Sequence, residues 1–308
     1  MVGFIQVIKL LKNFHSFLRQ ENSNENIDLL YVNTLSNFFV LPVARILKIK
    51  TLIHVHEILD SPKKVSGFIN KFGVKWASSI LAVSNAVKVN LLKNTNGALH
   101  HKIAVIHNGI PDLYDPEYDL YKKHTKCVIT LIGRIKPEKG IWYFLEALSL
   151  LKNKEDISVR IIGGAAPFGE SHVEQLKKDI LKLGVEIEYI PFTQNVKKYL
   201  NETDIVVVPS VGRESFPTTV LEGMSVGKTV IATTTGGAAE AIVPDESGFL
   251  INNNDPKKFA DILSKVIGDE TLRIKIGNQA RERYLACFSI ERFDSNMQKY
   301  LKHEIERK

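Results

Sequence analysis

The sequence has few cysteines and no long apolar run. Its 308 residues include only Cys127 and Cys287, which are too few for a disulfide framework and are not spaced as a metal motif. We therefore expect a protein of a reducing compartment, the cytoplasm. The most apolar stretch, 29–49, is interrupted by two asparagines, a proline and an arginine. No segment of the sequence is expected to span a membrane.

An acidic excess is also absent, because 41 Lys or Arg face 34 Asp or Glu, a net charge of +7. Residues 1–110 hold 13 basic against 5 acidic side chains, and the remaining residues hold 28 against 29. A basic first domain is attracted to anionic lipid head groups, so peripheral contact with the inner face of the cytoplasmic membrane is one explanation. A generally Lys-rich and Asn-rich composition is the other. We expect no nucleic-acid partner.

Short β-branched runs alternate with helical periods along the chain, which predicts α/β architecture with doubly wound parallel sheets. Residues 2–19 carry Lys9 and Lys12 inside their apolar pattern, which favours an amphipathic helix over a signal peptide. The expected strands are 28–32, 51–56, 79–83, 102–106, 127–132, 158–162, 186–190, 205–208 and 230–232. The expected helices in the second half are 141–152, 170–183, 196–199 and 218–225, with a last one at 289–308.

A segment rich in Pro, Asp and Tyr, 108–123, shows no clear period and is the expected linker. We therefore predict a first α/β domain over 1–115, a second over 116–285 and a C-terminal helix over 286–308 that packs back toward the first domain. Ligands of parallel α/β sheets bind beyond the carboxyl ends of the strands, so candidate site residues are sought there.

The stretch from 204 to 248 places a helix start at such a strand end. Strand 205–208 is followed by Pro217, which suits the first turn of a helix that ends at a Gly227 cap. The N–H groups near Thr218, Thr219 and Val220 are then expected to be free, and free N–H groups at a helix start form an anion site.

Two glutamates flank this expected anion site. Glu214 lies in the loop before it, and Glu222 lies about one turn inside the helix. Since a carboxylate does not favour phosphate, the pair is interpreted as acceptors for hydroxyl groups, and sugars are the obvious donors of such hydroxyls.

A second motif follows strand 127–132. Gly133 ends that strand, and Arg134 and Lys139 are five residues apart in a loop that contains Pro137. The two cations can contact one pyrophosphate, with Arg chelating and Lys acting as a point charge. A solvated loop is the alternative for the pair taken alone.

Together the motifs GRIKPEKG at 133–140, ESFPTTVLE at 214–222 and GGAAEAIVPDESGFL from 236 resemble a known family. It is the retaining GT-B glycosyltransferases that share the "glycosyltransferases group 1" domain, often called family 4, and the resemblance covers about 27–285. It implies two Rossmann-like domains that face a cleft. Members usually begin with a strand and a glycine-rich loop, whereas this sequence opens on a helix, so the first domain is expected to be incomplete.

The resemblance also implies roles for individual residues. Arg134 and Lys139 would hold the diphosphate of a nucleotide-sugar donor, Glu222 the ribose hydroxyls and Glu214 the donor sugar. The remaining expected donor contacts are Gly133, Phe216, Pro217, Thr218 and Thr219, with Phe192 in the loop near the base.

In the first half, the segment LIHVHEI places His56 after an apolar strand. The equivalent histidine of the family reaches the donor near the leaving phosphate, where His56 would donate a hydrogen bond or stabilise developing charge. His54 would point to the same face if the strand ran that far. A hydrogen-bonded interior histidine is the structural alternative.

The predicted function is a retaining transfer of a sugar from a nucleoside-diphosphate sugar to a saccharide or lipid-linked acceptor, in the synthesis of bacterial surface polysaccharide such as lipopolysaccharide, O-antigen or capsule. No cofactor and no metal are expected. Two alternatives stay open: an inactive nucleotide-sugar-binding remnant or subunit, and a sugar-nucleotide epimerase of GT-B fold.

One helical pattern has two interpretations. Phe68, Phe72 and Trp76 recur at helical spacing beside lysines. Core packing with a solvated basic edge is one interpretation, and a helix lying on a membrane surface is the other.

Overall fold

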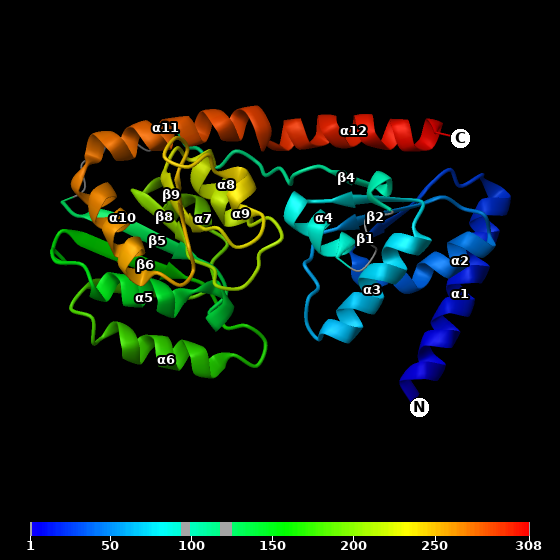
Figure 1. Ribbon diagram of the computed structural model, residues 1–308, viewed down its shortest axis with the longest axis horizontal. Helices are drawn as coiled ribbons and strands as arrows, with labels where there is room; N and C mark the ends of the chain where they lie inside the picture. The colour runs from blue at the N-terminus through cyan, green and yellow to red at the C-terminus, as the bar shows by residue number, and fades with distance from the viewer. Residues whose placement is uncertain (1, 94–98, 118–124, 308) are drawn as a thin grey trace. The chain divides into compact units, whose positions relative to one another are not determined.

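The computed structural model describes residues 2–93, 99–117 and 125–307 (Figure 1). The chain forms two compact units: unit 1 comprises residues 1–107 and 295–308, and unit 2 comprises residues 108–294. Each unit is built on a fully parallel sheet with helices, so the predicted fold class is confirmed. The units divide after residues 107 and 294, where the sequence suggested 115 and 285. Part of the expected linker, 118–123, lies outside the described residues.

Unit 1 contains a four-stranded sheet in the order β1-β2-β3-β4. Its strands are β1 (Leu30–Asn33), β2 (Thr51–Val55), β3 (Ser79–Ala82) and β4 (Ile103–Val105). Its helices are α1 (Val2–Asn24), α2 (Leu41–Ile46), α3 (Lys63–Trp76) and α4 (Asn85–Leu92), with 3₁₀ turns η1 (Leu35–Val40) and η2 (His100–Lys102). The β2 strand is buried along its whole length, which explains why its sequence shows no alternation.

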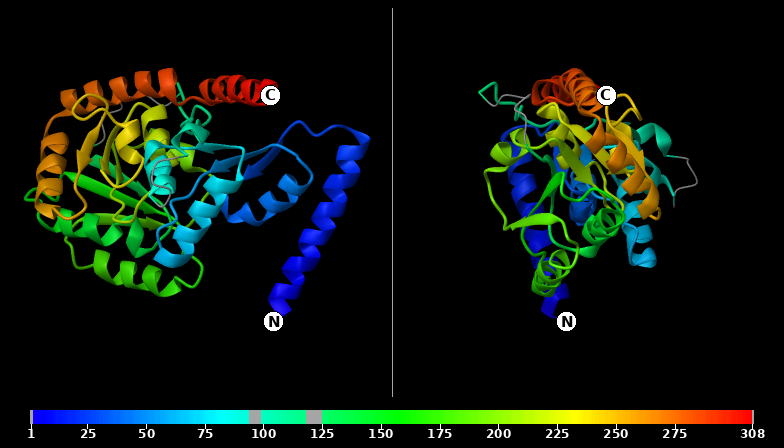
Figure 2. Two further views of the ribbon diagram at one scale, coloured as in Figure 1. Left: turned by 45° about the vertical axis from the view of Figure 1, so that its right-hand side comes forward. Right: turned by 90° about the vertical axis from the view of Figure 1, so that its left-hand side faces the viewer.

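The N-terminal helix follows the amphipathic pattern that predicted it, although it runs on to Asn24. Leu18 of α1 packs in a small apolar cluster with Val43, Ala44 and Ile49. Figure 2 shows the first turns of α1 extending past α2 toward the N-terminus. Unit 1 also includes the last turns of α12 (Ile290–Glu306). Just after this helix, the Arg307 carbonyl accepts a hydrogen bond from Lys50 Nζ.

Unit 2 contains a six-stranded sheet in the order β10-β9-β8-β5-β6-β7. Its strands are β5 (Cys127–Ile132), β6 (Ile157–Ile162), β7 (Glu186–Ile190), β8 (Ile205–Val208), β9 (Thr229–Thr233) and β10 (Phe249–Ile251). Its helical elements are η3 (Pro137–Lys139), α5 (Ile141–Ser149), α6 (Glu170–Ile180), α7 (Val196–Asn201), α8 (Thr218–Ser225), α9 (Ala238–Ala241), α10 (Pro256–Gly268) and α11 (Glu270–Cys287).

Helices cover both faces of this sheet, as a doubly wound fold requires (Figure 1). On one face, Ile129 and Val207 join Phe144 of α5 in the main core. On the other face, Val206 approaches α8 so closely that a Cβ on Gly223 would lie 3.1 Å from it. The absence of a side chain at Gly223 therefore lets α8 pack closely against the sheet. The first turn of α8 lies at the carboxyl edge of the sheet.

Several predicted helix ends are wrong by a few residues. The α5 helix ends at Ser149 and not at 152, because the Leu150 and Leu151 N–H groups form tight turn bonds to Ala147 and Leu148. The α6 helix similarly ends at Ile180 and not at 183. The α8 bounds are as predicted, and Gly227 follows in the left-handed conformation with φ of 68°.

The aromatic residues of α3 divide between the two interpretations given above. Phe72 stacks on Trp76 with ring centroids 5.0 Å apart, and Phe38 packs edge-on against Phe72. Phe68, however, is 60% exposed. In the part of the chain that the structure describes, no helix is both long enough and apolar enough to cross a membrane.

Candidate functional site

The predicted residues of unit 2 gather where β5, β6 and β8 end. Gly133 follows β5, and its N–H donates to the Ile162 carbonyl at the end of β6 at 2.9 Å. A Cβ on Gly163 would lie 1.8 Å from the Gly133 carbonyl oxygen. Only glycine at 163 permits this approach, so the two loops lie against each other at the carboxyl edge of the sheet.

The η3 turn follows β5 and places Lys139 near the end of β8. Gly140 adopts φ of 71° after it, and a Cβ there would lie 1.8 Å from the Pro209 carbonyl oxygen. The N–H groups of Val211 and Gly212 both donate to the Glu138 carbonyl, at 3.0 and 2.9 Å. These contacts fix the loop that carries Arg134 and Lys139 against the loop that carries Glu214.

Lys139 and Glu214 form an ion pair at the junction of these loops. Lys139 Nζ lies 2.7 Å from Glu214 Oε1, and the Ser210 hydroxyl donates to the same oxygen at 2.9 Å. The two side chains are 28% and 21% exposed, so the pair is partly withdrawn from water. Among the described residues nothing donates to Glu214 Oε2, which leaves this atom able to accept a hydroxyl group.

Residues outside the predicted set hold Ser210 and Glu214 in place. The Ser210 carbonyl accepts the hydroxyls of Thr233 and Thr235 at 2.6 and 2.9 Å. The Glu214 carbonyl accepts the Gly237 N–H at 2.9 Å, and a Cβ on Gly236 would lie 1.9 Å from that oxygen. The glycines of the quoted motif from 236 were the sequence signal for this contact.

The start of α8 differs from the prediction in one respect. Pro217 is the N-cap, and no side chain caps the helix. The Val220 N–H donates to the Pro217 carbonyl at 3.2 Å, so the expectation that this group is free was wrong: a tight first turn satisfies it. The anion site can therefore use only the groups at Thr218 and Thr219.

Glu222 lies half-buried on α8, one turn beyond its start. Burial raises the pKa of this carboxyl, and a hydrogen bond from the Thr218 hydroxyl acts in the opposite direction. A carboxylate with little water and one hydrogen-bond donor can readily accept further hydroxyl groups.

The remaining predicted residues of unit 2 are of two kinds. Arg134 is exposed, and in the described part of the chain it has no ion-pair partner. Phe192 follows β7 and is 75% exposed beside Gly164, where a Cβ would lie 3.3 Å from Phe192 Cβ. Phe216 is buried against Phe288, with ring centroids 5.7 Å apart, so its side chain belongs to the core.

His56 belongs to unit 1, directly after β2. Its ring lies 4.0 Å from that of His54, centroid to centroid, so the two share one face as predicted. Burial lowers the pKa of His56, while neighbouring Glu57 acts against this. His56 is consequently a neutral imidazole at pH 7, able to donate from one ring nitrogen.

Glu57, which sequence reasoning did not select, organises this edge of unit 1. Its Oε1 accepts the Thr34 hydroxyl and the Ser36 N–H, the latter at 3.1 Å, and its Oε2 accepts the His56 N–H at 3.0 Å. The carboxylate thus ties the end of β1 to the end of β2. The position of a polar residue directly after the end of a predicted strand was the sequence signal that could have indicated this role.

His54 fits the structural alternative of an interior histidine. It is 2% exposed, its Nδ1 is hydrogen-bonded to the Tyr31 hydroxyl, and its Nε2 has no partner among the described residues. Burial and the proximity of His56 lower its pKa to about 3. It is therefore a neutral interior histidine in contact with the His56 ring.

Two family models match the chain. The model for glycosyl transferases group 1 covers residues 119–283, more than half of the chain, and the model for glycosyltransferase family 4 covers residues 4–112. The first range contains Arg134, Lys139 and Glu214, and the second contains His56.

Curated relatives agree with the family models. The chain is 29% identical over 241 residues to the D-inositol 3-phosphate glycosyltransferase of Corynebacterium glutamicum, covering 72% of this chain and 57% of that protein. It is 27% identical over 233 residues to the capsular polysaccharide biosynthesis glycosyltransferase CapM of Staphylococcus aureus, covering 72% and 60%. The chain thus spans about three fifths of these two relatives.

A solved structure shares the fold. Anabaena HepE in complex with UDP superposes with a TM-score of 0.83 at 23% identity, covering 96% of this chain and 81% of that one. The GT-B fold is therefore shown. The matched model over 119–283, which contains Lys139, Glu214 and Glu222, establishes that the chain belongs to the family of group 1 glycosyl transferases.

Proposed function

We propose that the protein transfers a sugar from a nucleoside-diphosphate sugar to a saccharide or lipid-linked acceptor, with retention of anomeric configuration. The observation that carries this proposal is the paired Lys139 and Glu214 beside the start of α8. The Lys139 ammonium group, which can bind phosphate, is hydrogen-bonded there to the Glu214 carboxylate, which can accept a hydroxyl group. A nucleotide sugar carries a phosphate and sugar hydroxyl groups close to each other.

The donor's diphosphate would be bound by positive charge from three sources. Arg134 is exposed and free of carboxylates among the described residues, Lys139 is half-buried, and the α8 start adds backbone N–H groups. Glu222 would accept the ribose hydroxyls, since its partly desolvated carboxylate has room for further donors. UDP and UDP-glucose occupy the similar HepE structures, which supports a uridine donor as the first to test.

Chemistry would proceed on one face of the sugar. The bond between the anomeric carbon and the diphosphate oxygen would break as Arg134 and Lys139 stabilise the growing charge of the diphosphate. The acceptor oxygen would bond to that carbon on the same face, and its proton would pass to the leaving oxygen. Glu214 Oε2 would hold a donor sugar hydroxyl and thereby fix the ring. In this scheme no carboxylate serves as nucleophile, so electrostatic stabilisation of the transition state accounts for the rate acceleration.

His56 would contribute as a hydrogen-bond donor near the leaving phosphate. Its lowered pKa makes the neutral form dominant at pH 7, so a neutral N–H and not an imidazolium would meet the donor. His54 and Glu57 would fix the orientation of the ring and of its backbone.

The acceptor is proposed from the relatives. CapM acts in capsular polysaccharide biosynthesis, which supports a growing surface polysaccharide as acceptor. A lipid-linked acceptor would place the basic unit 1 in the cytoplasm beside an anionic membrane surface. The exposed Phe68 on α3 fits such a location.

A donor panel tests the proposal. The purified chain is titrated with UDP-, GDP-, ADP- and TDP-sugars by calorimetry, and nucleotide release is followed with and without saccharide acceptors. We expect one donor to bind, with nucleotide release that an acceptor accelerates. The anomeric proton coupling of the product, compared by NMR with that of the donor, then tests retention.

The other outcomes separate the alternatives. Binding without turnover for any acceptor would indicate a nucleotide-sugar-binding subunit. Nucleotide release with a free, epimerised sugar and no acceptor dependence would indicate an epimerase. No binding of any donor would contradict the proposal.

A further inference from the structure

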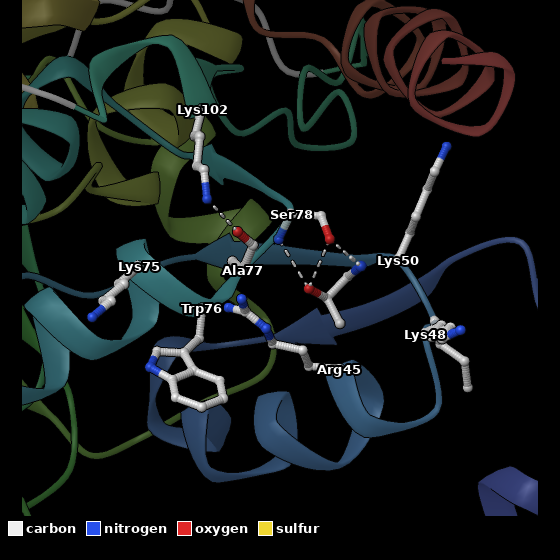
Figure 3. A pocket seen from close by; sticks show the side chains of 10 residues that line it. Arg45, Lys48, Lys50, Lys75, Trp76, Ala77, Ser78 and Lys102 are labelled. Carbon is white, nitrogen blue, oxygen red and sulfur yellow. Dashed lines mark hydrogen bonds between the residues drawn. The ribbon is translucent and has the colours of Figure 1, made fainter. Parts of the chain in front are cut away.

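Unit 1 contains a cavity at the end of its sheet opposite His56. The cavity measures about 290 Å³ and is lined by Arg45, Lys48, Ile49, Lys50, Thr51, Lys75, Trp76, Ala77, Ser78 and Lys102 (Figure 3). These residues come from the C-terminal ends of α2 and α3 and from the starts of β2, β3 and β4. A five-residue strand separates this edge from His56 by roughly 16 Å. The cavity is therefore no part of the site described above.

Five of the lining side chains are cations and none is a carboxylate. Arg45 lies over the Trp76 ring, with its guanidinium carbon 5.1 Å from the ring centroid, and Lys102 reaches in from the far side to donate to the Ala77 carbonyl at 3.0 Å. Figure 3 shows Lys50 and Lys75 turned away from the Ala77 and Ser78 floor, so Arg45 and Lys102 are the convergent pair and the other lysines form the rim.

Helix dipoles account for only part of this charge. Arg45 and Lys75 occupy the last turns of α2 and α3, where a cation complements the negative helix end. Each helix end carries roughly half a negative charge at most, so the two together offset about one of the five cations. In the described part of the chain none of the five pairs with a carboxylate, which leaves a strong positive excess.

The convergent pair is held in place despite its mutual repulsion. Burial lowers the pKa of Lys102, and the charge of Arg45 lowers it further. A dianion between the two cations would relieve this repulsion, and the planar guanidinium is already oriented by stacking on Trp76. The Trp76 indole also gives the cavity a fluorescent reporter.

We propose that this cavity binds a phosphate- or pyrophosphate-bearing ligand between Arg45 and Lys102. The phosphate group is the shared chemistry of two sources: a soluble phosphorylated metabolite and the head group of an anionic lipid. The ligand would bind at the amino edge of unit 1, independently of any nucleotide-sugar donor.

Trp76 fluorescence tests the proposal. The chain contains two tryptophans, so Trp142→Phe leaves Trp76 as the single reporter. This variant is titrated with sodium pyrophosphate, with glycerol phosphate, and with phosphatidylcholine vesicles with or without phosphatidylglycerol. We expect a saturable change of Trp76 emission with at least one phosphate ligand. A response to soluble phosphates identifies a metabolite, and a response to anionic vesicles alone identifies a lipid head group.

Variants locate the binding. Arg45→Gln with Lys102→Gln should weaken the response at least tenfold. Lys63→Gln with Lys64→Gln removes the same charge from the other end of α3 and should change affinity less than twofold. Because Lys102 bonds the Ala77 carbonyl, circular dichroism checks the fold of the double variant, and Arg45→Gln alone, on an exposed side chain, should still weaken binding about threefold.

Three results would overturn the proposal. One is the absence of a Trp76 response to every phosphate ligand and vesicle. Another is equal affinity in the Arg45 and Lys63/Lys64 variants, which would indicate diffuse surface charge. The third is loss of the response in Arg134→Gln with Lys139→Gln, which would assign the binding to unit 2.

Discussion

The carboxyl edges of the two sheets are built alike but charged differently. In unit 2, this edge carries an exposed Arg134 and a Lys139–Glu214 pair with one free carboxylate oxygen among the described contacts. In unit 1, it carries two imidazoles of lowered pKa and a carboxylate, Glu57, bonded by its neighbours. One edge offers charge to a ligand, whereas the other offers a neutral hydrogen-bond donor.

The overall charge of the units runs against this pattern. Residues 1–110 carry 13 basic against 5 acidic side chains, and five of these cations, Arg45 and Lys102 among them, line the cavity at the amino edge of unit 1. Unit 2 is nearly balanced and still presents cations at its carboxyl edge. The net charge of a domain therefore does not indicate which of its surfaces can bind an anion, because this depends on where the loops place the charged side chains.

The largest expected effect comes from removing the cation of unit 2. Lys139→Ala should lower kcat by about 10² to 10³, the usual cost of one lost transition-state donor. Steady-state transfer with the donor identified by the panel measures this. Lys136→Ala, in the same loop, is the matched control and should change kcat less than threefold.

A purely structural role for Lys139 predicts a different pattern. If the lysine only held Glu214 in place, Glu214→Gln would cost as much as Lys139→Ala, and Lys139→Arg would not restore activity. We expect Lys139→Arg to recover at least tenfold of the loss because charge is retained. Equal defects in all three variants would contradict the proposed role.

The next largest effect concerns donor affinity. Glu222→Gln should weaken donor binding about 10- to 100-fold, because hydrogen bonds to a charged acceptor contribute roughly 1.5–3 kcal/mol. Calorimetry measures this, with the exposed Glu246→Gln as control. Since the pKa of Glu222 is raised, donor affinity should also begin to fall on acidification above the ordinary carboxyl range. Unchanged affinity in Glu222→Gln would remove Glu222 from the site.

The neutral edge of unit 1 predicts an acid-sensitive stability. The pKa of His54 is about 3 when folded and 6.5 in an ordinary environment, so the unfolded chain binds more protons between these values. Stability is therefore lost as the pH falls below 6.5, by about 2 kcal/mol at pH 5. Urea unfolding of Trp142→Phe, followed through Trp76 at pH 7 and pH 5, measures the loss.

His54→Gln is the matched variant for this effect. It should be less stable at pH 7, because the Tyr31 hydroxyl loses its imidazole partner. Its stability should nevertheless depend less on pH between 7 and 5, since the buried titrating group is gone. An unchanged pH dependence would mean that other groups, His56 among them, cause the acid sensitivity.

The sequence predicted the strands and helices at both carboxyl edges better than the side-chain contacts between their loops. Strand 205–208 and helix 218–225 were predicted to the residue, because buried β-branched runs, Pro217 and Gly227 are strong local signals. The Ser210 network and the role of Glu57 were missed. Their partners, Thr233, Thr235 and Thr34, lie at or just after the ends of other strands, and no periodicity encodes which loops meet in space.

The smallest expected effect separates a ligand contact from a surface side chain. Phe192 is 75% exposed beside Gly164, so the ring leaves most of its apolar surface in water. Stacking of a nucleotide base on the ring would use that surface and contributes about 1 kcal/mol. Phe192→Ala should then weaken donor affinity about fivefold while changing unfolding free energy by less than about 0.5 kcal/mol. Leu181→Ala, at an 85% exposed position, should change neither quantity. Equal donor affinity in Phe192→Ala and Leu181→Ala would leave base recognition to the backbone, and the edge of unit 2 would then bind its donor through polar groups alone.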